Sequence, residues 1–254
     1  NLGDCMVDEQ GEALDDLEAR TGRDVSLHVD AASGGMVAPF IQPDLVWDFR
    51  LSRVHSINTS GHKYGLVYPG LGWVIWRDKE YLPEDLIFHV SYLGGDMPTL
   101  ALNFSRPGAQ VLLQYYLFVR LGMDGYRTIH QLSQNIALML SRGIGAMEPF
   151  ELLTKGDELP VFAWRMKPGH TTNWDLQDLS ERLRLNGWQV PAYPMPDDIS
   201  DVWVMRIVVR LGLLPSTANL LLKDIREAVT YLDALDGPMP RIGRTGKANR
   251  FTYS

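Results

Sequence analysis

Four polar residues that could do chemistry lie at or just beyond two short β-rich runs: His28, Asp30, His62 and Lys63. The first run covers residues 25–30 and is followed by small loop residues, so Asp30 stands at its carboxyl end. Each of these residue types is common in loops and is often structural when it occurs alone. Polar groups that are distant in sequence converge in space when their strands end at the same edge of a sheet. We therefore treat them as one candidate site.

Two chemistries compete for this cluster. His28, Asp30 and His62 supply three nitrogen or oxygen ligands for a metal ion, but the Lys63 ammonium would repel a divalent cation and no further ligand follows at the usual spacing. Alternatively, Lys63 forms an imine with an aldehyde cofactor while Asp30 keeps a pyridine nitrogen protonated. The second pairing describes pyridoxal phosphate, and we favour it over a metal site.

The neighbours of these residues suit the same cofactor. Ala32 is small enough for a flat ring to lie close to the backbone, and Ser60 and His62 could donate hydrogen bonds to a phosphate. With 24 Lys and Arg against 31 Asp and Glu, the formal net charge is −7. A phosphate must therefore be neutralised locally, and the chain has no basic field for binding nucleic acid.

The elements that must position these residues can be predicted from periodicity. Residues 8–20 have the pattern of a surface helix, and residues 25–30, 54–58 and 71–76 have the pattern of buried strands. Strands joined by helix-length connections indicate an α/β fold with a mostly parallel sheet, in which ligands bind at the carboxyl ends of strands. The loops that carry Asp30 and Lys63 follow two such ends.

After Pro107 the pattern changes to long helical periodicity that is interrupted at Gly122, which predicts two helices or one kinked helix. A smaller α+β unit follows. Its expected strands are 150–153, 161–166 and 202–209, and its expected helices are 174–185 and 217–235.

Composition bounds the class of protein. The 254 residues are 45 % hydrophobic and 22 % charged, which is typical of a globular protein. The single cysteine, Cys5, excludes an internal disulfide and favours a reducing, cytoplasmic location. The longest apolar runs, such as residues 136–140, fall far short of the about 18 residues of a membrane helix, and we expect no membrane partner.

Several motifs together carry a specific family resemblance. They are His28-Val-Asp-Ala-Ala-Ser-Gly-Gly, Trp47-Asp-Phe-Arg, Ser60-Gly-His-Lys-Tyr-Gly, Gly72-Trp-Val-Ile-Trp-Arg, Tyr92-Leu-Gly-Gly, Asn103-Phe-Ser-Arg and Gly187-Trp-Gln-Val-Pro-Ala. From residue 21 to 235 the sequence resembles the glutamate decarboxylases of bacteria and plants, in group II of the pyridoxal-phosphate-dependent decarboxylases. The resemblance implies an α/β protein of fold-type I, the aminotransferase-like fold, with decarboxylation of L-glutamate to 4-aminobutyrate and carbon dioxide.

The resemblance also implies residue roles. Lys63 would be the catalytic imine-forming lysine and Asp30 the partner of the pyridinium nitrogen, with Ala32 packed on the ring and Ser60 and His62 on the phosphate. The resemblance gives roles to three further residues. Phe104 and Ser105 would lie near the phosphate of a neighbouring subunit, and Arg210 would bind the substrate α-carboxylate. A homodimer or a larger assembly of dimers follows from the shared site. The spacing alone does not separate Arg206 from Arg210, and only the resemblance favours Arg210.

In the domain division that we predict, residues 1–122 are part of the cofactor-binding large domain and 123–148 form a connecting helix. Residues 149–237 form the small C-terminal domain, and 238–254 form a flexible tail. Glycine and proline interrupt the basic residues of this tail, so we do not expect calmodulin binding.

The family's other phosphate ligands, ring-stacking residue and distal-carboxylate pocket lie upstream of the part that this sequence matches. We therefore expect an N-terminally truncated large domain that binds the cofactor weakly or is inactive alone. Two other functions stay open. One is decarboxylation of a different amino acid, because these residues define the cofactor and not the substrate. The other is a catalytically dead fragment that acts as a dimerisation partner.

Overall fold

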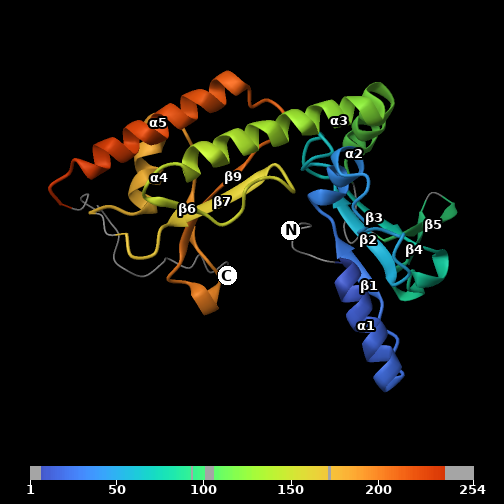
Figure 1. Ribbon diagram of the computed structural model, residues 1–254. Coiled ribbons are helices and arrows are strands. Elements are labelled where there is room, and N and C mark those ends of the chain that lie inside the picture. Colours follow the sequence, from blue (N-terminus) through green and yellow to red (C-terminus); the bar gives the residue numbers. More distant parts are fainter. Residues whose placement is uncertain (1–6, 93, 101–105, 171–172, 238–254) are drawn as a thin grey trace. The chain divides into compact units, whose positions relative to one another are not determined.

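A computed structural model describes residues 7–92, 94–100, 106–170 and 173–237. These residues form two compact units, and each has its own sheet (Figure 1). The first unit contains the described residues up to Asn135 together with Gly156–Pro160 and Val209–Gly212, and the second contains the rest. The domain boundaries predicted from the sequence stay a prediction, and the tail 238–254 lies outside the described residues.

The first unit is built on a three-stranded sheet of order β1-β2-β3. Helix α1 (Val7–Thr21) precedes strand β1 (Leu27–Asp30), which pairs in parallel with β2 (Val54–Ser60). Strand β3 (Gly72–Trp76) pairs with β2 in the antiparallel sense. The sheet is therefore mixed, whereas the sequence predicted a mostly parallel one. The pattern of apolar residues does not distinguish a mixed sheet from a parallel one, because the direction of β3 depends on the short connection after the Lys63 loop.

The alternation of side chains along β1 separates core from site. Val29 is buried, whereas His28 and Asp30 lie on the opposite, exposed face. The buried side holds one hydrophobic cluster, formed by Val7, Val29, Ala31, Ala38, Trp47, Val54 and Ile57. The core thus fixes β1 and β2 from one side and leaves Asp30 accessible from the other.

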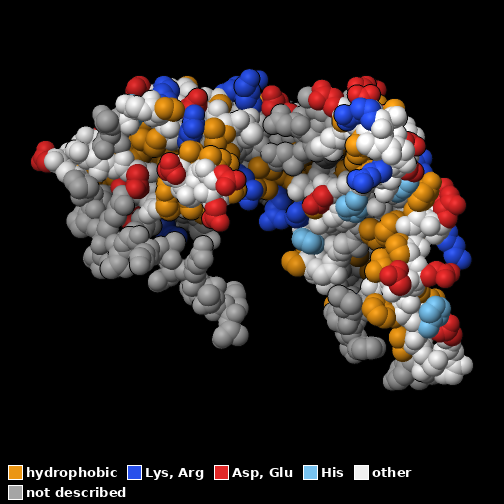
Figure 2. All heavy atoms as spheres, turned by 90° about the horizontal axis from the view of Figure 1, so that it is seen from below, with side chains coloured by type: hydrophobic (Ala, Val, Ile, Leu, Met, Phe, Trp, Pro, Cys, Tyr) orange, Lys and Arg blue, Asp and Glu red, His pale blue; other side chains and the backbone are white. Residues whose placement is uncertain are grey.

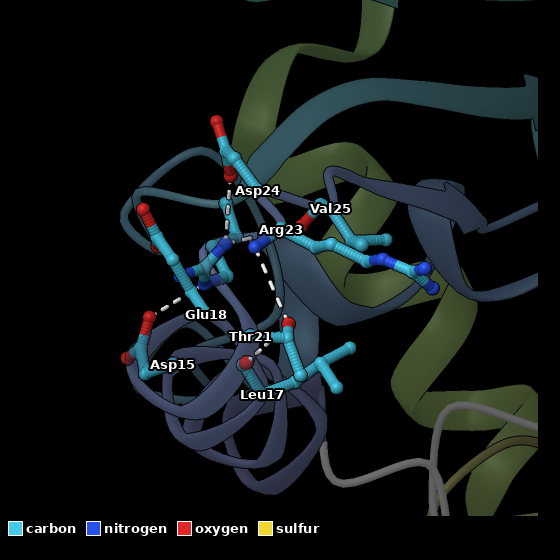
Figure 3. Close-up of polar contacts among 8 residues, drawn as sticks. Asp15, Leu17, Glu18, Thr21, Arg23, Asp24 and Val25 are labelled. Carbon is cyan, nitrogen blue, oxygen red and sulfur yellow. Dashed lines mark hydrogen bonds and ion pairs between the residues drawn. The ribbon is translucent and has the colours of Figure 1, made fainter.

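Arg53 ties helix α1 to the segment that enters β1. Figure 3 shows its acidic partners Asp15, Glu18 and Asp24 close to one another. The Arg53 guanidinium donates to Asp15 and Glu18 on the helix, to Asp24 at 2.9 Å, and to the carbonyl oxygen of Val25. The hydrogen bond to Asp15 is the largest of the interactions that raise the pKa of Arg53 above its ordinary value. Because Arg53 directly precedes β2, this one side chain connects the helix with the starts of both parallel strands.

Shorter elements complete the first unit. The hairpin of β4 (Phe88–Tyr92) and β5 (Gly95–Thr99) was not expected from the sequence. Helix α2 and three short 3₁₀ helices occupy Ala38–Ile41, Gly34–Met36, Lys79–Tyr81 and Glu84–Leu86. Gly35 allows one of these turns to pack on the sheet, because a Cβ there would lie 2.8 Å from Thr59 Oγ1.

Helix α3 (Ala109–Gly145) passes from the first unit into the second. Gly122 interrupts it with φ 59° and ψ −167°, so the predicted interruption at this glycine is confirmed. The left-handed φ is one that glycine adopts without strain. Among the helices of the described residues, none combines the length and hydropathy needed to cross a membrane.

The second unit contains a four-stranded antiparallel sheet of order β6-β7-β9-β8, with helices α4 and α5 packed against each other (Figure 1). The strands are β6 (Phe150–Leu152), β7 (Val161–Met166), β8 (Ala192–Pro194) and β9 (Trp203–Val208). The helices are α4 (Leu176–Leu185) and α5 (Pro215–Asp233), with a 3₁₀ turn at Asp197–Ile199. Asp175 caps α4 by accepting the backbone N–H groups of Gln177 and Asp178. Strand β8 was not expected from the sequence.

His130 on α3 lies in an aromatic box in the first unit. Its ring is within 6 Å, centroid to centroid, of the rings of Phe40, Tyr64 and Tyr126, and the residue is 1 % exposed. Neither ring nitrogen has a hydrogen-bond partner among the described residues. Burial lowers the pKa of His130 from 6.5 to about 4, so the imidazole is neutral in the folded chain at neutral pH.

This burial predicts a loss of stability in acid. Between about pH 6.5 and pH 4 the unfolded chain binds a proton at His130 that the folded chain does not, so the free energy of unfolding falls as the pH is lowered. From pH 7 to pH 4.5 the contribution of this group is about 2 to 3 kcal/mol. Urea unfolding at both pH values should show a smaller acid destabilisation for His130→Met than for the wild type. Equal pH dependence of the two proteins would contradict the assignment.

Candidate active site

The parallel pairing of β1 and β2 brings the candidate residues to one edge of the sheet. Asp30 is in register with Asn58, and the ladder continues past the strand ends. The backbone N–H of Ala31 donates to the carbonyl of Asn58, and that of Ser60 donates to the carbonyl of Ala32, both at 3.1 Å. The segment after Asp30 and the start of the Lys63 loop therefore run side by side, as the sequence predicted.

The Asp30 carboxylate is held in its ionised form. A hydrogen bond from the Asn58 side chain is the largest cause of its lowered pKa, followed by the backbone N–H of Ala32, which donates to Oδ1 at 3.1 Å. The positive charge of Lys63 and the proximity of His28 act in the same direction. The side chain is also exposed on the site face of β1. It is thus an accessible anion with its charge fixed by the protein.

Lys63 lies in a tight turn that follows β2. Its backbone N–H donates to the carbonyl of Ser60 at 3.2 Å, and the N–H of Val67 returns to the carbonyl of Gly61 at 3.4 Å. Lys63 is exposed, whereas the next two residues, Tyr64 and Gly65, are buried beneath it. The turn therefore presents an amine to solvent, and the positive charge of Lys63 is one of the causes that lower the pKa of Asp30.

His62 is fixed by a hydrogen bond between Nδ1 and the carbonyl oxygen of Leu71, at 3.1 Å. A carbonyl only accepts, so Nδ1 carries a proton, and Nε2 makes no hydrogen bond to the part of the chain that the structure describes. The neutral ring then offers a lone pair at Nε2, and the imidazolium offers a donor. His62 can therefore donate to an anion in its protonated form.

The other predicted site residues have different outcomes. Phe104 and Ser105 lie outside the described residues. Strand β9 ends at Val208, one residue before the predicted end, and Arg210 follows it. Arg210 is exposed and makes no ion pair within the described part of the chain, whereas Arg206 lies over the ring of Tyr193.

Asn58 was missed by the sequence analysis, although its side chain contributes most to the ionisation of Asp30. Its position directly beside Asp30 follows from the strand register, for which the sequence carries no signal. His28 bonds through Nδ1 to Ser56 Oγ at 2.8 Å, so it is tied to the sheet. In the part of the chain that the structure describes, no group of three or more His, Cys, Asp or Glu residues could hold a metal ion.

An amine and an ionised carboxylate at the carboxyl edge of a parallel strand pair suit an aldehyde cofactor with a protonated ring. The family model of the pyridoxal-dependent decarboxylase conserved domain matches residues 5–167, which is more than half of the chain. The chain belongs to the pyridoxal-dependent decarboxylase family. Both Asp30 and Lys63 lie within the matched region.

Among the similar proteins of this family are glutamate decarboxylases of bacteria. The chain is 49 % identical over 226 residues to "Glutamate decarboxylase" of Lactococcus lactis subsp. lactis, and 53 % identical over 221 residues to "Glutamate decarboxylase" of Aliivibrio fischeri. Each match covers 87 % of this chain and 48 % of the relative. The chain thus spans about half the length of the curated relatives it matches.

Solved structures of decarboxylases share the fold. The structure of the Lactobacillus brevis glutamate decarboxylase matches with a TM-score of 0.85 and 46 % identity, over 90 % of this chain and 52 % of that chain. A tryptophan decarboxylase of Catharanthus roseus matches with a TM-score of 0.66 at 16 % identity, which shows the fold alone. The predicted fold-type I class is confirmed.

The close packing of the Lys63 turn predicts how an added side chain at Gly65 would affect stability. A Cβ at Gly65 would lie 2.5 Å from the carbonyl oxygen of Gly61 and 2.6 Å from Gln114 Oε1, so Gly65→Ala should lower the free energy of unfolding by about 1 to 3 kcal/mol. Gly11 in α1 has open space around it, and Gly11→Ala should instead stabilise by about 0.5 to 1 kcal/mol. Denaturant unfolding of both variants checks this contrast, and an unchanged midpoint for Gly65→Ala would contradict the packing.

Proposed function

We propose that this chain carries the lysine-bearing part of a pyridoxal-phosphate-dependent glutamate decarboxylase, which converts L-glutamate to 4-aminobutyrate and carbon dioxide. The observation that supports it most is that the Lys63 turn and the ionised Asp30 carboxylate lie at the same edge of the β1–β2 pair. The glutamate decarboxylases that match at about half identity support the substrate.

The residues present fit the cofactor. Asp30 is an exposed carboxylate whose pKa is lowered by donors, so it suits a protonated pyridine nitrogen. Ala32 offers a small, half-buried side chain for contact with a ring, and Ser60 and His62 offer a hydroxyl and an anchored imidazole for a phosphate. When bound, pyridoxal phosphate supplies an electron sink for the carbanion that forms when the carboxylate leaves Cα.

The chain's own residues then have three tasks. Lys63 would hold the aldehyde cofactor through Nζ, and its amine would hold the proton that is delivered to Cα of the substrate. Asp30 holds the ring proton in place by its fixed negative charge. Arg210, exposed and without an ion pair among the described residues, is proposed to bind the substrate α-carboxylate with two parallel hydrogen bonds. Because a proton takes the place of the departing carbon dioxide on Cα, the reaction consumes one proton and is favoured in acid.

Replacement of the lysine tests this function. The wild-type chain is incubated with pyridoxal phosphate and reduced with borohydride, and the modified lysine is identified by peptide mass mapping. We expect modification at Lys63, none at position 63 in Lys63→Ala, and unchanged labelling at Lys63 in Lys79→Ala, whose lysine lies in a distant exposed turn. Carbon dioxide release from glutamate should fall by at least about 10³-fold in Lys63→Ala of the assembled enzyme.

Two results would overturn the proposal: decarboxylation of glutamate by Lys63→Ala at the wild-type rate, or labelling of the wild type without preference for Lys63. A screen of carbon dioxide release over other amino acids separates glutamate from a different substrate. A chain that assembles but never labels Lys63 would instead be the dimerisation partner considered from the sequence. The single cysteine supports a cytoplasmic location for the enzyme.

An assembly of at least two copies is part of the proposal. Hydrophobic side chains reach the surface of both units (Figure 2), and the first part of α3 has several of them. Leu112, Tyr115 and Val119 are 72 %, 69 % and 70 % exposed, at spacings that place them along one side of the helix. An apolar helix face of this kind is typical of an interface.

A charge on this face should weaken the assembly. We expect Leu112→Glu to raise the dissociation constant of the oligomer at least about tenfold, because a carboxylate would have to be buried there. The control is Gln131→Glu, which adds the same charge at an exposed position of the same helix outside this face. Sedimentation velocity over a concentration series measures the effect. A wild-type chain that stays monomeric at every concentration would exclude self-assembly of this chain.

A further inference from the structure

Two side chains from α3 converge on one backbone carbonyl beneath Lys63. Gln114 Nε2 donates to the carbonyl oxygen of Gly65 at 2.9 Å, and Tyr126 Oη donates to the same oxygen at 3.0 Å. Gln114 Nε2 also donates to Tyr126 Oη at 2.9 Å. The carbonyl oxygen of Gly65 therefore accepts from both side chains. Both side chains are buried, and Gly65 is only two residues after Lys63.

The orientation of the Gln114 amide is fixed by this arrangement. If the amide were turned over, Oε1 would face the carbonyl oxygen of Gly65, and two acceptors would repel each other. Oε1 instead lies against Gly61 and Gly65, where a Cβ on either glycine would be 2.6 Å from it. This contact favours glycine at both ends of the Gly61-His-Lys-Tyr-Gly65 turn, and at Gly65 the carbonyl oxygen of Gly61 adds a second close approach.

The same contact has a cost. Gln114 Oε1 is buried and has no hydrogen-bond partner among the described residues, which is unfavourable for a polar atom. An apolar side chain of similar length would fill this space without that cost. A glutamine here is therefore better explained by what its amide nitrogen holds than by packing.

The kink in α3 makes the convergence possible. Gln114 and Tyr126 are twelve residues apart, and on a straight helix their Cα atoms would be separated by about 18 Å along the axis. Gly122 lies between them with a non-helical backbone and a positive φ, so the helix is kinked there. The two side chains meet at 2.9 Å only because the helix is interrupted there.

The backbone after the turn is strained. Leu66 has a φ of 69°, and it has the only positive φ found for a non-glycine residue in the described part of the chain. Such a conformation costs of order 1 kcal/mol or more and persists only where the surroundings enforce it. The carbonyl of Gly65, directly before Leu66, is the group that Gln114 and Tyr126 hold.

We propose that Gln114 and Tyr126 are positioning residues for Lys63. They fix the Gly65 carbonyl and so hold the turn in the conformation that keeps the lysine amine on the side of Asp30. The inference rests on the proposed function in so far as Lys63 is the cofactor-binding lysine. Neither residue contacts the cofactor in this proposal, and both act through the backbone of the turn.

The first test needs no cofactor. Hydrogen exchange of the amides of residues 61–67 is compared among Gln114→Met, Tyr126→Phe, the double variant and the control Gln131→Met, which is exposed on the same helix. Each single variant leaves one donor on the Gly65 carbonyl, so exchange should rise less than about threefold. The double variant leaves a buried carbonyl without a partner, and exchange should rise at least about tenfold. Wild-type exchange in the double variant would overturn the proposal.

The second test reports on the position of the Lys63 amine. Borohydride trapping with pyridoxal phosphate is quantified at Lys63 relative to Lys79 and Lys155 in the same chain, below the unfolding transition of every variant. We expect this ratio to fall at least about tenfold in the double variant and to stay unchanged in Gln131→Met. A role in general stability would leave the ratio unchanged, so faster exchange with an unchanged ratio overturns the positioning role.

Two further outcomes keep the proposals separate. If the wild type shows no preference for Lys63, the proposed function fails, while the exchange measurement still decides whether the turn is clamped. If the double variant does not fold, Gln114→Glu replaces it, because its carboxylate removes the amide donor and repels the Gly65 carbonyl at nearly the same size. Wild-type exchange and labelling in Gln114→Glu would then overturn the proposal.

Discussion

The parallel register between β1 and β2 is the constraint on which the candidate site depends. It sets Asp30 beside Asn58 and continues through the hydrogen bond from Ser60 to Ala32, so the two loops leave the sheet together. A shift by one residue would turn Asp30 into the core and Val29 out of it, because side chains alternate along a strand. Burial of Val29 and the anchoring of both strand starts by Arg53 oppose such a shift.

The sequence was sufficient for the parts of the site that follow from strand ends. Asp30 and Lys63 could be placed at one edge because a buried run ends at each loop, and the interruption of α3 could be placed because Gly122 breaks a regular pattern. The direction of β3 and the β4–β5 hairpin were not predicted, because side-chain periodicity does not indicate strand direction and the hairpin residues are mostly exposed. Asn58 was missed for a related reason, since its role depends on register alone.

The contacts that Gln114 and Tyr126 make beneath the Lys63 turn could not be predicted either, and the reason is geometric. Gln114 and Tyr126 reach one carbonyl only when a helix interruption brings together residues that a straight helix separates. Helical periodicity assigns a residue to a face but does not describe how two helical segments fold against each other. The glycines of the turn indicate that another group packs closely against its backbone, but they do not identify which side chain it is.

Several features that lower stability lie close to the Lys63 turn. Gln114 Oε1 and both nitrogens of His130 are buried without partners among the described residues, and Leu66 has a left-handed backbone. Tyr64, the residue after Lys63, contacts the His130 ring, so these features lie close together. Each lowers stability, and a sequence optimised for stability alone would replace them with apolar or glycine residues. Their concentration under an exposed lysine is the pattern expected where the chain gives up stability to hold one amine in place.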